Sequence, residues 1–191
     1  MDKFRKRVYQ AEEAAYGNIY GTFFFDEDKT NISETDALDY IRGILSSSWW
    51  KKRWPFVNKL YVRFPKNPKM GGLSYTSKRL MNISSTCIKP FVISHELAHF
   101  GVPEVYEPHG FEFMGTYADI VRQFIGADEA EELEWCYTRQ GLFDVVYPKP
   151  SPKVAKPKTV DVQWLRGRHP THDQMKDFSE YGLHKAWRGG R

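Results

Sequence analysis

The segment SHELAHFGVPEVYEPHGFEF, residues 94–113, contains three of the six histidines of the chain and four of its glutamates. At its start, HELAH at residues 95–99 matches the pattern HExxH. Two residues four positions apart on a helix share one face, ~6 Å apart along the axis, so both imidazoles can reach one ion at ~2.0–2.1 Å. The pattern therefore predicts a zinc site in which His95 and His99 are ligands.

Glu96 is expected to do the chemistry at this site. Because it directly follows the first ligand, it is poorly placed to bind the same ion and well placed to reach a water molecule held there. It would take the proton of that water as a general base, for attack on a carbonyl group that the ion polarises. A catalytic zinc ion also needs a third protein ligand and one open coordination position.

His109 is the best candidate for the third ligand. The nine-residue loop between His99 and His109 contains two prolines and is about long enough to reverse the chain. We expect His109 to begin the next helix, where the helix dipole favours the neutral imidazole that binds metal, and Gly110 to leave room for close approach. Three carboxylates of the same segment remain alternatives for this position: Glu104, Glu107 and Glu112.

Two further observations concern the same segment. Phe113 should fix the second helix in the core, and Glu112 is a candidate hydrogen-bond partner for a histidine N–H. The longer pattern HExxHxxGxxH fails, because Gly101 is one residue early and Val105 stands where the third histidine would be. The sequence therefore excludes the metzincin family.

Apolar spacing and turn residues predict the elements that hold these side chains. Helices are expected over residues 2–16, which Gly17 stops, from residue 33 toward Trp49, over 89–100, which Gly101 breaks, and over 109–125 and 128–141. Strands are expected over residues 21–25 and 59–64 and, after a turn at 65–72, as a pair over 73–77 and 79–84.

Three details of these elements can be checked. Ser33 and Asp128, each followed three residues later by an acid, resemble helix caps. Pro90 suits the first turn of a helix, where its missing N–H would have no partner. In the strand over residues 59–64, alternation predicts that Tyr61 and Arg63 face outward.

Composition predicts one domain over residues 1–147, a Pro/Lys linker over 148–160 and a basic tail over 161–191. The net charge is +4, and residues 151–191, which include the end of the linker and the tail, hold nine Lys or Arg against four acidic residues. Cys87 and Cys136 lack metal-binding spacing and are expected to be buried thiols. No run approaches the ~18 apolar residues that span a bilayer, so we expect a soluble protein of a reducing cytoplasm without membrane contact.

The chain resembles the SprT-like zincin metalloproteins and, more narrowly, the HExxH metallohydrolases of actinobacteria and their phages. The resemblance covers about residues 5–147 and depends on five segments: RVYQAE at 7–12, SSSWWKKRWP at 46–55, HELAH at 95–99, HGFEF at 109–113 and IGADEAEEL at 125–133. It implies a small α+β zincin fold with a short antiparallel or mixed sheet, in which the helix after HExxH supplies the third ligand. It further implies one Zn²⁺ ion bound by His95, His99 and His109, with Glu96 as catalytic acid/base.

Basic residues could contact nucleic acid at two places. In the segment WWKKRW, residues 49–54, tryptophans alternate with three cations that could pair with phosphates while the rings stack on bases: Lys51, Lys52 and Arg53. We favour the simpler interpretation, in which the tryptophans pack into the core and the charges are solvated. The tail adds two candidates, Arg166 and Arg168.

The sequence predicts a zinc-dependent metallopeptidase that acts on a protein or peptide substrate, in the cytoplasm of its host or in a virion if a phage encodes it. Four side chains are candidates for stabilising the oxyanion: Tyr75, Tyr106, Tyr117 and Arg122. Two other functions stay open. One is a non-catalytic structural or interaction protein in which zinc only stabilises the fold. The other is a DNA-directed protease that the basic tail localises to DNA.

Overall fold

The computed structural model of the chain describes residues 2–21, 30–66, 71–142 and 161–164. Within these ranges the fold is α+β, with six α-helices and a mixed four-stranded sheet, which confirms the predicted fold class at this level. Most of the strand predicted over residues 21–25, the linker over 148–160 and the tail beyond residue 164 lie outside the described residues.

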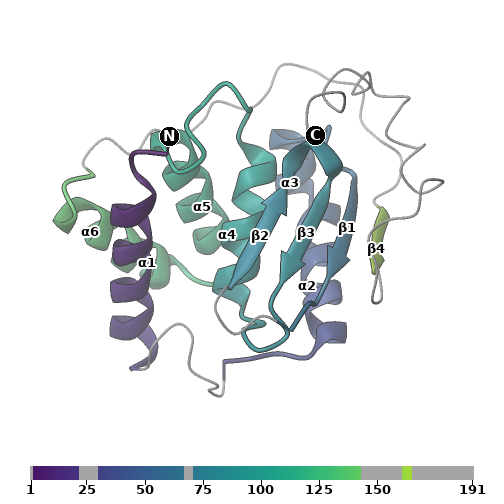
Figure 1. The fold of residues 1–191 in the computed structure, drawn as a ribbon, viewed down its shortest axis with the longest axis horizontal. Coiled ribbons are helices and arrows are strands. Elements are labelled where there is room, and N and C mark those ends of the chain that lie inside the picture. Colours follow the sequence, from purple (N-terminus) through teal and green to yellow (C-terminus); the bar gives the residue numbers. More distant parts are fainter. Residues whose placement is uncertain (1, 22–29, 67–70, 143–160, 165–191) are drawn as a thin grey trace, which may run out of the picture.

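In chain order the elements are α1 (Arg5–Tyr20), α2 (Glu34–Ser46), α3 (Ser48–Arg53), β1 (Lys59–Arg63), β2 (Gly72–Tyr75), a 3-10 turn (Thr76–Lys78), β3 (Leu80–Ile83), α4 (Pro90–Gly101), α5 (Phe111–Phe124), α6 (Ala127–Arg139) and β4 (Asp161–Trp164). Figure 1 shows α1 and α6 at one end of the molecule and the sheet at the other, with α2 and α3 behind the sheet. Between them, α6 packs on α5, α5 on α4, and α4 on β2.

The strand order in the sheet is β2–β3–β1–β4. β2 and β3 form the predicted antiparallel pair, whereas β3 and β4 both run parallel to β1 (Figure 1). β4 comes from the segment that composition places in the tail: Val162 pairs with Leu60, and the Asp161 N–H donates to Asn58 O at 2.7 Å. The open edge of β1 can accept such an extended segment, and the pairing buries Val162 to 8% exposure.

The prediction that alternate residues of β1 face solvent is wrong for Tyr61. Leu60 and Val62 lie in the main core, but Tyr61 is only 1% exposed and packs with Leu80 on the opposite face of the sheet. β1 is an inner strand with a parallel neighbour on each side, and strands in that position are commonly buried on both faces.

Two helix boundaries were predicted incorrectly, the end of α1 and the start of α6. α1 continues through Gly17 and ends at Gly21, whose φ of 69° is left-handed and whose N–H bonds to Gly17 O at 2.9 Å. The N-cap of α6 is Gly126, so Asp128 lies inside the first turn. There its charge suits the positive end of the helix dipole, but it does not cap the helix.

The predicted starts of α2 and α4 are confirmed. The Asp36 N–H donates to the hydroxyl oxygen of Ser33 at 3.1 Å, which satisfies one of the unpaired donors at the start of α2. Pro90 opens α4, where its missing N–H leaves no helical hydrogen bond unmade.

α4 is buried along almost its whole length, with every residue from 91 to 98 buried. Gly101, expected to break this helix, is instead its last residue and allows close packing. A Cβ at Gly101 would lie 2.9 Å from Trp54 Cε2 and 3.0 Å from Thr116 Cγ2. A side chain at this position would therefore separate α4 from α5 and from the residue that follows α3.

The tryptophans of the segment at residues 49–54 pack into the core, as predicted. Trp50 is fully buried and Trp54 is 5% exposed. The guanidinium of Arg53 lies 4.2 Å from the centre of the Trp49 ring, a stacked cation–π contact. This part of the chain therefore has a structural role that needs no nucleic acid.

Both cysteines, Cys87 and Cys136, are buried free thiols, as predicted. Burial, with help from a hydrogen bond to Glu132, raises the pKa of the Cys136 thiol to about 11, so it stays protonated at neutral pH. Among the described helices, none is both long and apolar enough to cross a membrane.

Gly101→Ala should lower the free energy of unfolding by about 1 to 3 kcal/mol, because the added methyl group overlaps Trp54 and Thr116 in a packed core. Unfolding in urea measures this change. Gly43→Ala is the matched control, because nothing lies within 4 Å of a Cβ there, and it should be neutral or stabilising by up to about 1 kcal/mol. Wild-type stability of Gly101→Ala would contradict the packing role.

Candidate metal centre

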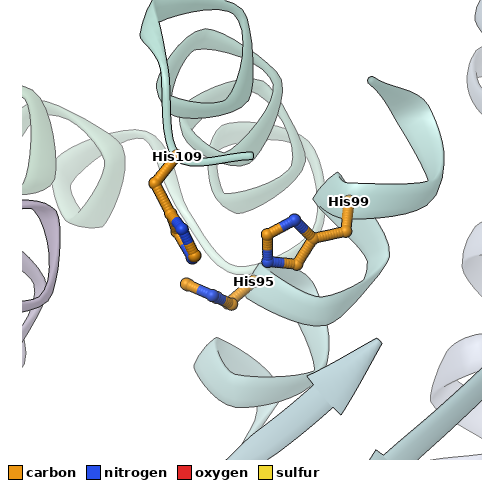
Figure 2. Close-up of side chains that lie close together, drawn as sticks. All are labelled: His95, His99 and His109. Carbon is orange, nitrogen blue, oxygen red and sulfur yellow. The ribbon is translucent and has the colours of Figure 1, made fainter. Parts of the chain in front are cut away.

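Three imidazoles converge between α4 and the loop that precedes α5 (Figure 2). His95 and His99 come from successive turns of α4, and His109 faces them from the loop. One nitrogen of each imidazole lies within 4.8 Å of a nitrogen of each of the other two rings. The ligand atoms of a tetrahedral zinc ion are about 3.4 Å apart. Small rotations of the side chains would therefore bring the three nitrogens to one metal ion. In the part of the chain that the structure describes, this is the one group of side chains placed to hold a metal ion.

His109 owes its position to the loop over residues 102–110, and the prediction that it begins the helix is wrong. α5 begins at Phe111 with Gly110 as its N-cap, so His109 precedes the helix. The Gly110 N–H donates to Glu107 O at 2.9 Å, and a Cβ at Gly110 would lie 3.0 Å from Glu107 Cβ. This tight turn, rather than the first helical turn, directs the imidazole toward α4.

Phe113 supports all three rings and is fully buried, as predicted. Its ring centroid lies 4.8 Å from that of His95, 4.5 Å from that of His99 and 4.9 Å from that of His109. Contact with one rigid aromatic ring restricts the rotamers of the imidazoles and excludes water from behind them.

Glu12 of α1 holds the His95 ring. Both of its carboxylate oxygens lie 3.0 Å from His95 Nδ1, and the Tyr137 hydroxyl of α6 donates to Glu12 Oε1 at 3.3 Å. Because a carboxylate only accepts hydrogen bonds, Nδ1 carries the proton and the lone pair of Nε2 is left for a metal.

Asp2 holds the His109 ring in the same way, through a hydrogen bond between its carboxylate and His109 Nδ1. The other ring nitrogen, Nε2, is buried and has no hydrogen-bond partner among the described residues. A buried acceptor without a partner costs about 1 to 3 kcal/mol, and a bound cation would remove that cost. The environment of His109 therefore fits a metal ligand better than a core histidine.

The surroundings keep two of the three imidazoles neutral, as metal ligation requires. Burial, together with the charges of His95, His109 and Arg5, lowers the pKa of His99 to about 2. Burial and the charge of His95 lower the pKa of His109 despite its bond to Asp2. At His95 burial acts in the same direction, but the charge and hydrogen bond of Glu12 outweigh it and raise the pKa.

Glu96 is held against β2 and is not part of the histidine cluster. It is 4% exposed, and the Ser74 hydroxyl lies 2.6 Å from its Oε2. A Cβ at Gly72 would lie 2.6 Å from both Cγ and Oε1 of Glu96, so only glycine lets the strand approach this closely. Burial raises the pKa of Glu96, although the charge of His95 and the bond from Ser74 offset part of the rise.

The side chains predicted to stabilise an oxyanion are dispersed. The Tyr117 hydroxyl donates to Phe91 O at 3.2 Å inside the core, and Arg122 forms an ion pair with a carboxylate of α6 at 2.9 Å. Tyr75 and Tyr106 are 38% and 43% exposed, on β2 and in the loop over residues 102–110. The structure thus gives two of the four candidates, Tyr117 and Arg122, other partners.

Glu112, predicted as a partner for a histidine N–H, does not make the Nδ1 bonds at His95 and His109, which belong to Glu12 and Asp2. The proposed nucleic-acid contacts Arg166 and Arg168 lie outside the described residues.

Sequence analysis missed three residues near the N-terminus. Glu12 had a usable signal, because it lies four residues after Val8 on the buried stripe of α1, where a carboxylate is costly without a partner. Asp2 precedes the helix and had no such signal. Tyr9, whose ring lies 5.1 Å from that of His109, was hidden on the mostly exposed side of the helix.

Glu12→Gln should weaken zinc binding about 10- to 100-fold, because a neutral amide orients His95 less firmly and no longer raises the basicity of Nε2. Competition with a chelator of known affinity measures the change. Glu13→Gln is the matched control: it points about 100° away around α1 and should stay within about twofold of wild type. Unchanged zinc affinity of a folded Glu12→Gln protein would contradict the role of Glu12.

Comparisons of the chain with protein-family models, with curated proteins and with solved structures gave no match. The function proposed below therefore depends on the motif and on the geometry of the site.

Proposed function

We propose that this chain is a zinc-dependent peptidase of the zincin type, in which His95, His99 and His109 hold one zinc ion and Glu96 is the general base. The observation that carries the proposal is the convergence of three imidazoles beside a buried carboxylate that does not join them. Structural zinc sites usually have four protein ligands, whereas three leave a coordination position open for chemistry. The resemblance of HELAH and HGFEF to SprT-like zincins supports the same assignment.

A zinc ion held by these imidazoles would supply Lewis acidity and lower the pKa of a water molecule to ~7. The chain itself supplies orientation. Glu12 and Asp2 fix the rings of His95 and His109 through Nδ1, and Ser74 fixes the carboxylate of Glu96.

Glu96 moves the proton. It accepts a proton from the attacking water, whose oxygen bonds to the carbonyl carbon of the substrate, and returns that proton to the amine when the C–N bond breaks. One water is consumed for each bond cleaved, and the products are a carboxylic acid and an amine. The burial of Glu96 keeps competing solvent away from this transfer.

Strand β2 favours a peptide over other amides as the substrate. It is the outermost strand on its side of the sheet among the described strands, and Gly72 and Ser74 of this strand contact Glu96. An extended peptide can add to such an edge through main-chain hydrogen bonds, which would bring its carbonyl groups alongside Glu96. Leu73, which alternates with these residues, is 37% exposed and available to contact substrate side chains.

Glu96→Gln should retain one zinc ion per chain and lose proteolysis about 10²- to 10⁴-fold, because the amide cannot accept the proton of water. Cleavage of a casein-type substrate and metal analysis of the purified protein measure both properties. Glu104→Gln, which alters an exposed carboxylate of the nearby loop, is the matched control and should cleave at the wild-type rate.

The same experiment tests the non-catalytic alternative. A structural zinc site predicts a wild-type protein that binds zinc, loses stability when the zinc is removed and cleaves nothing, with Glu96→Gln indistinguishable from it. That result would overturn the peptidase proposal.

Gly72→Ala should lower kcat about 10²-fold while zinc content stays intact, because the new methyl group overlaps Glu96 Cγ and Oε1 and displaces the carboxylate by about 1 Å. Steady-state kinetics with metal analysis measures the effect. Gly43→Ala again serves as control. Wild-type kcat for Gly72→Ala would show that the position of Glu96 does not depend on β2.

A further inference from the structure

Tyr9 borders the imidazoles with a hydroxyl that the mechanism above does not use. Its ring centroid lies 5.1 Å from that of His109, edge to face, and 5.7 Å from that of His95. It stands three residues before Glu12 on α1, so the two side chains are neighbours on the helix surface. The helix that orients His95 therefore also brings a phenol to the ligand cluster.

We infer that the Tyr9 hydroxyl donates a hydrogen bond to the negative charge that develops on the substrate carbonyl oxygen, and that Arg5 positions this hydroxyl. The inference rests on the proposed peptidase function and assigns the oxyanion role that the sequence leaves open.

Tyr9 is accessible from solvent as well as close to the imidazoles. Its side chain is 40% exposed, unlike the fully buried Tyr117. It also lines an open hollow of about 740 Å³ along the outer side of α1, whose described lining includes Gln10 and Glu13. The Tyr9 ring thus contacts the imidazoles of His95 and His109, while part of the side chain remains open to solvent.

Arg5, one turn before Tyr9, suits a positioning role. Its guanidinium carbon lies 5.3 Å from the centre of the Tyr9 ring, and its charge also reaches His95 and His99. Arg5 has only hydrogen-bond donors, so its interaction with the phenol oxygen leaves the O–H of Tyr9 directed at another acceptor.

The phenol is protonated at neutral pH, as a donor must be. Burial raises the pKa of Tyr9, Arg5 opposes the rise, and the carboxylates of Glu12 and Glu96 add to it.

The first test is Tyr9→Phe, which keeps the ring against His95 and His109 and removes only the hydroxyl. We expect kcat to fall about 10²- to 10³-fold, as on loss of one oxyanion donor, with KM and zinc content close to wild type. Tyr20→Phe is the matched control: it removes a hydroxyl of similar exposure, 37%, near the other end of α1, and should leave kcat unchanged.

The second test replaces Arg5. Arg5→Gln should lower kcat less than Tyr9→Phe does, and Arg5→Lys should restore most of the loss because it keeps a charged donor near the phenol. Equal loss in both Arg5 variants, with zinc affinity reduced in parallel, would show that Arg5 only supports the fold of α1.

A third test does not depend on turnover. A phosphinic peptide presents a tetrahedral anion like that of the transition state, and calorimetry measures its affinity for the zinc-loaded protein. Tyr9→Phe should weaken its binding about 10- to 100-fold, whereas Tyr20→Phe should not.

The outcomes separate this inference from the proposed function. If wild type and Tyr9→Phe cleave peptide equally well, the role of Tyr9 is overturned while the peptidase stands. If the wild type cleaves nothing, the peptidase proposal is overturned, and binding of the phosphinic peptide tests the role of Tyr9. Weaker binding to Tyr9→Phe than to wild type then supports Tyr9 as a hydrogen-bond donor to an anion. Equal affinity for both proteins, or no binding to either, overturns the inference.

Discussion

The buried hydrogen bond between Glu12 and His95 is the interaction on which the histidine cluster depends. It joins side chains 83 residues apart and fixes α1 against α4, with Tyr137 of α6 as a second partner of the carboxylate. A carboxylate buried to 5% exposure would be costly without such partners. The bond therefore links the packing of α1, α4 and α6 to the tautomer of the His95 imidazole. The ring is oriented only when these helices pack together.

His95 and Glu96 lie on different sides of α4 and contact different elements. Neighbouring residues on a helix point about 100° apart, so His95 faces α1 and the loop while Glu96 faces the sheet. The carboxylate of Glu12 holds the first, and the hydroxyl of Ser74 holds the second. The imidazole and the carboxylate can thus be adjacent in the chain without competing for the same partner, because each is anchored to a different layer of the fold.

Close approach between layers depends on positions where no side chain would fit. At Gly72 the strand meets Glu96, and at Gly101 the end of α4 meets Trp54 and Thr116. Sequence analysis interpreted Gly101 as a helix breaker because local rules connect glycine with turns. Its role in close packing depends on Trp54 and Thr116, which are distant in the sequence and therefore absent from any local pattern.

The position of His95 and His99 on one face of a helix could be predicted from the sequence, because helical spacing is a local property and holds wherever that helix packs. The sequence also predicted the β2–β3 pair and His109 as the third member of the cluster. The folded structure was needed to place Glu12 and Asp2 against the rings, Tyr9 beside them, Tyr61 in a buried position and residues 161–164 next to β1 in the sheet. Each of these depends on contacts between distant segments, whose energies come from burial and pairing rather than from the order of neighbouring residues.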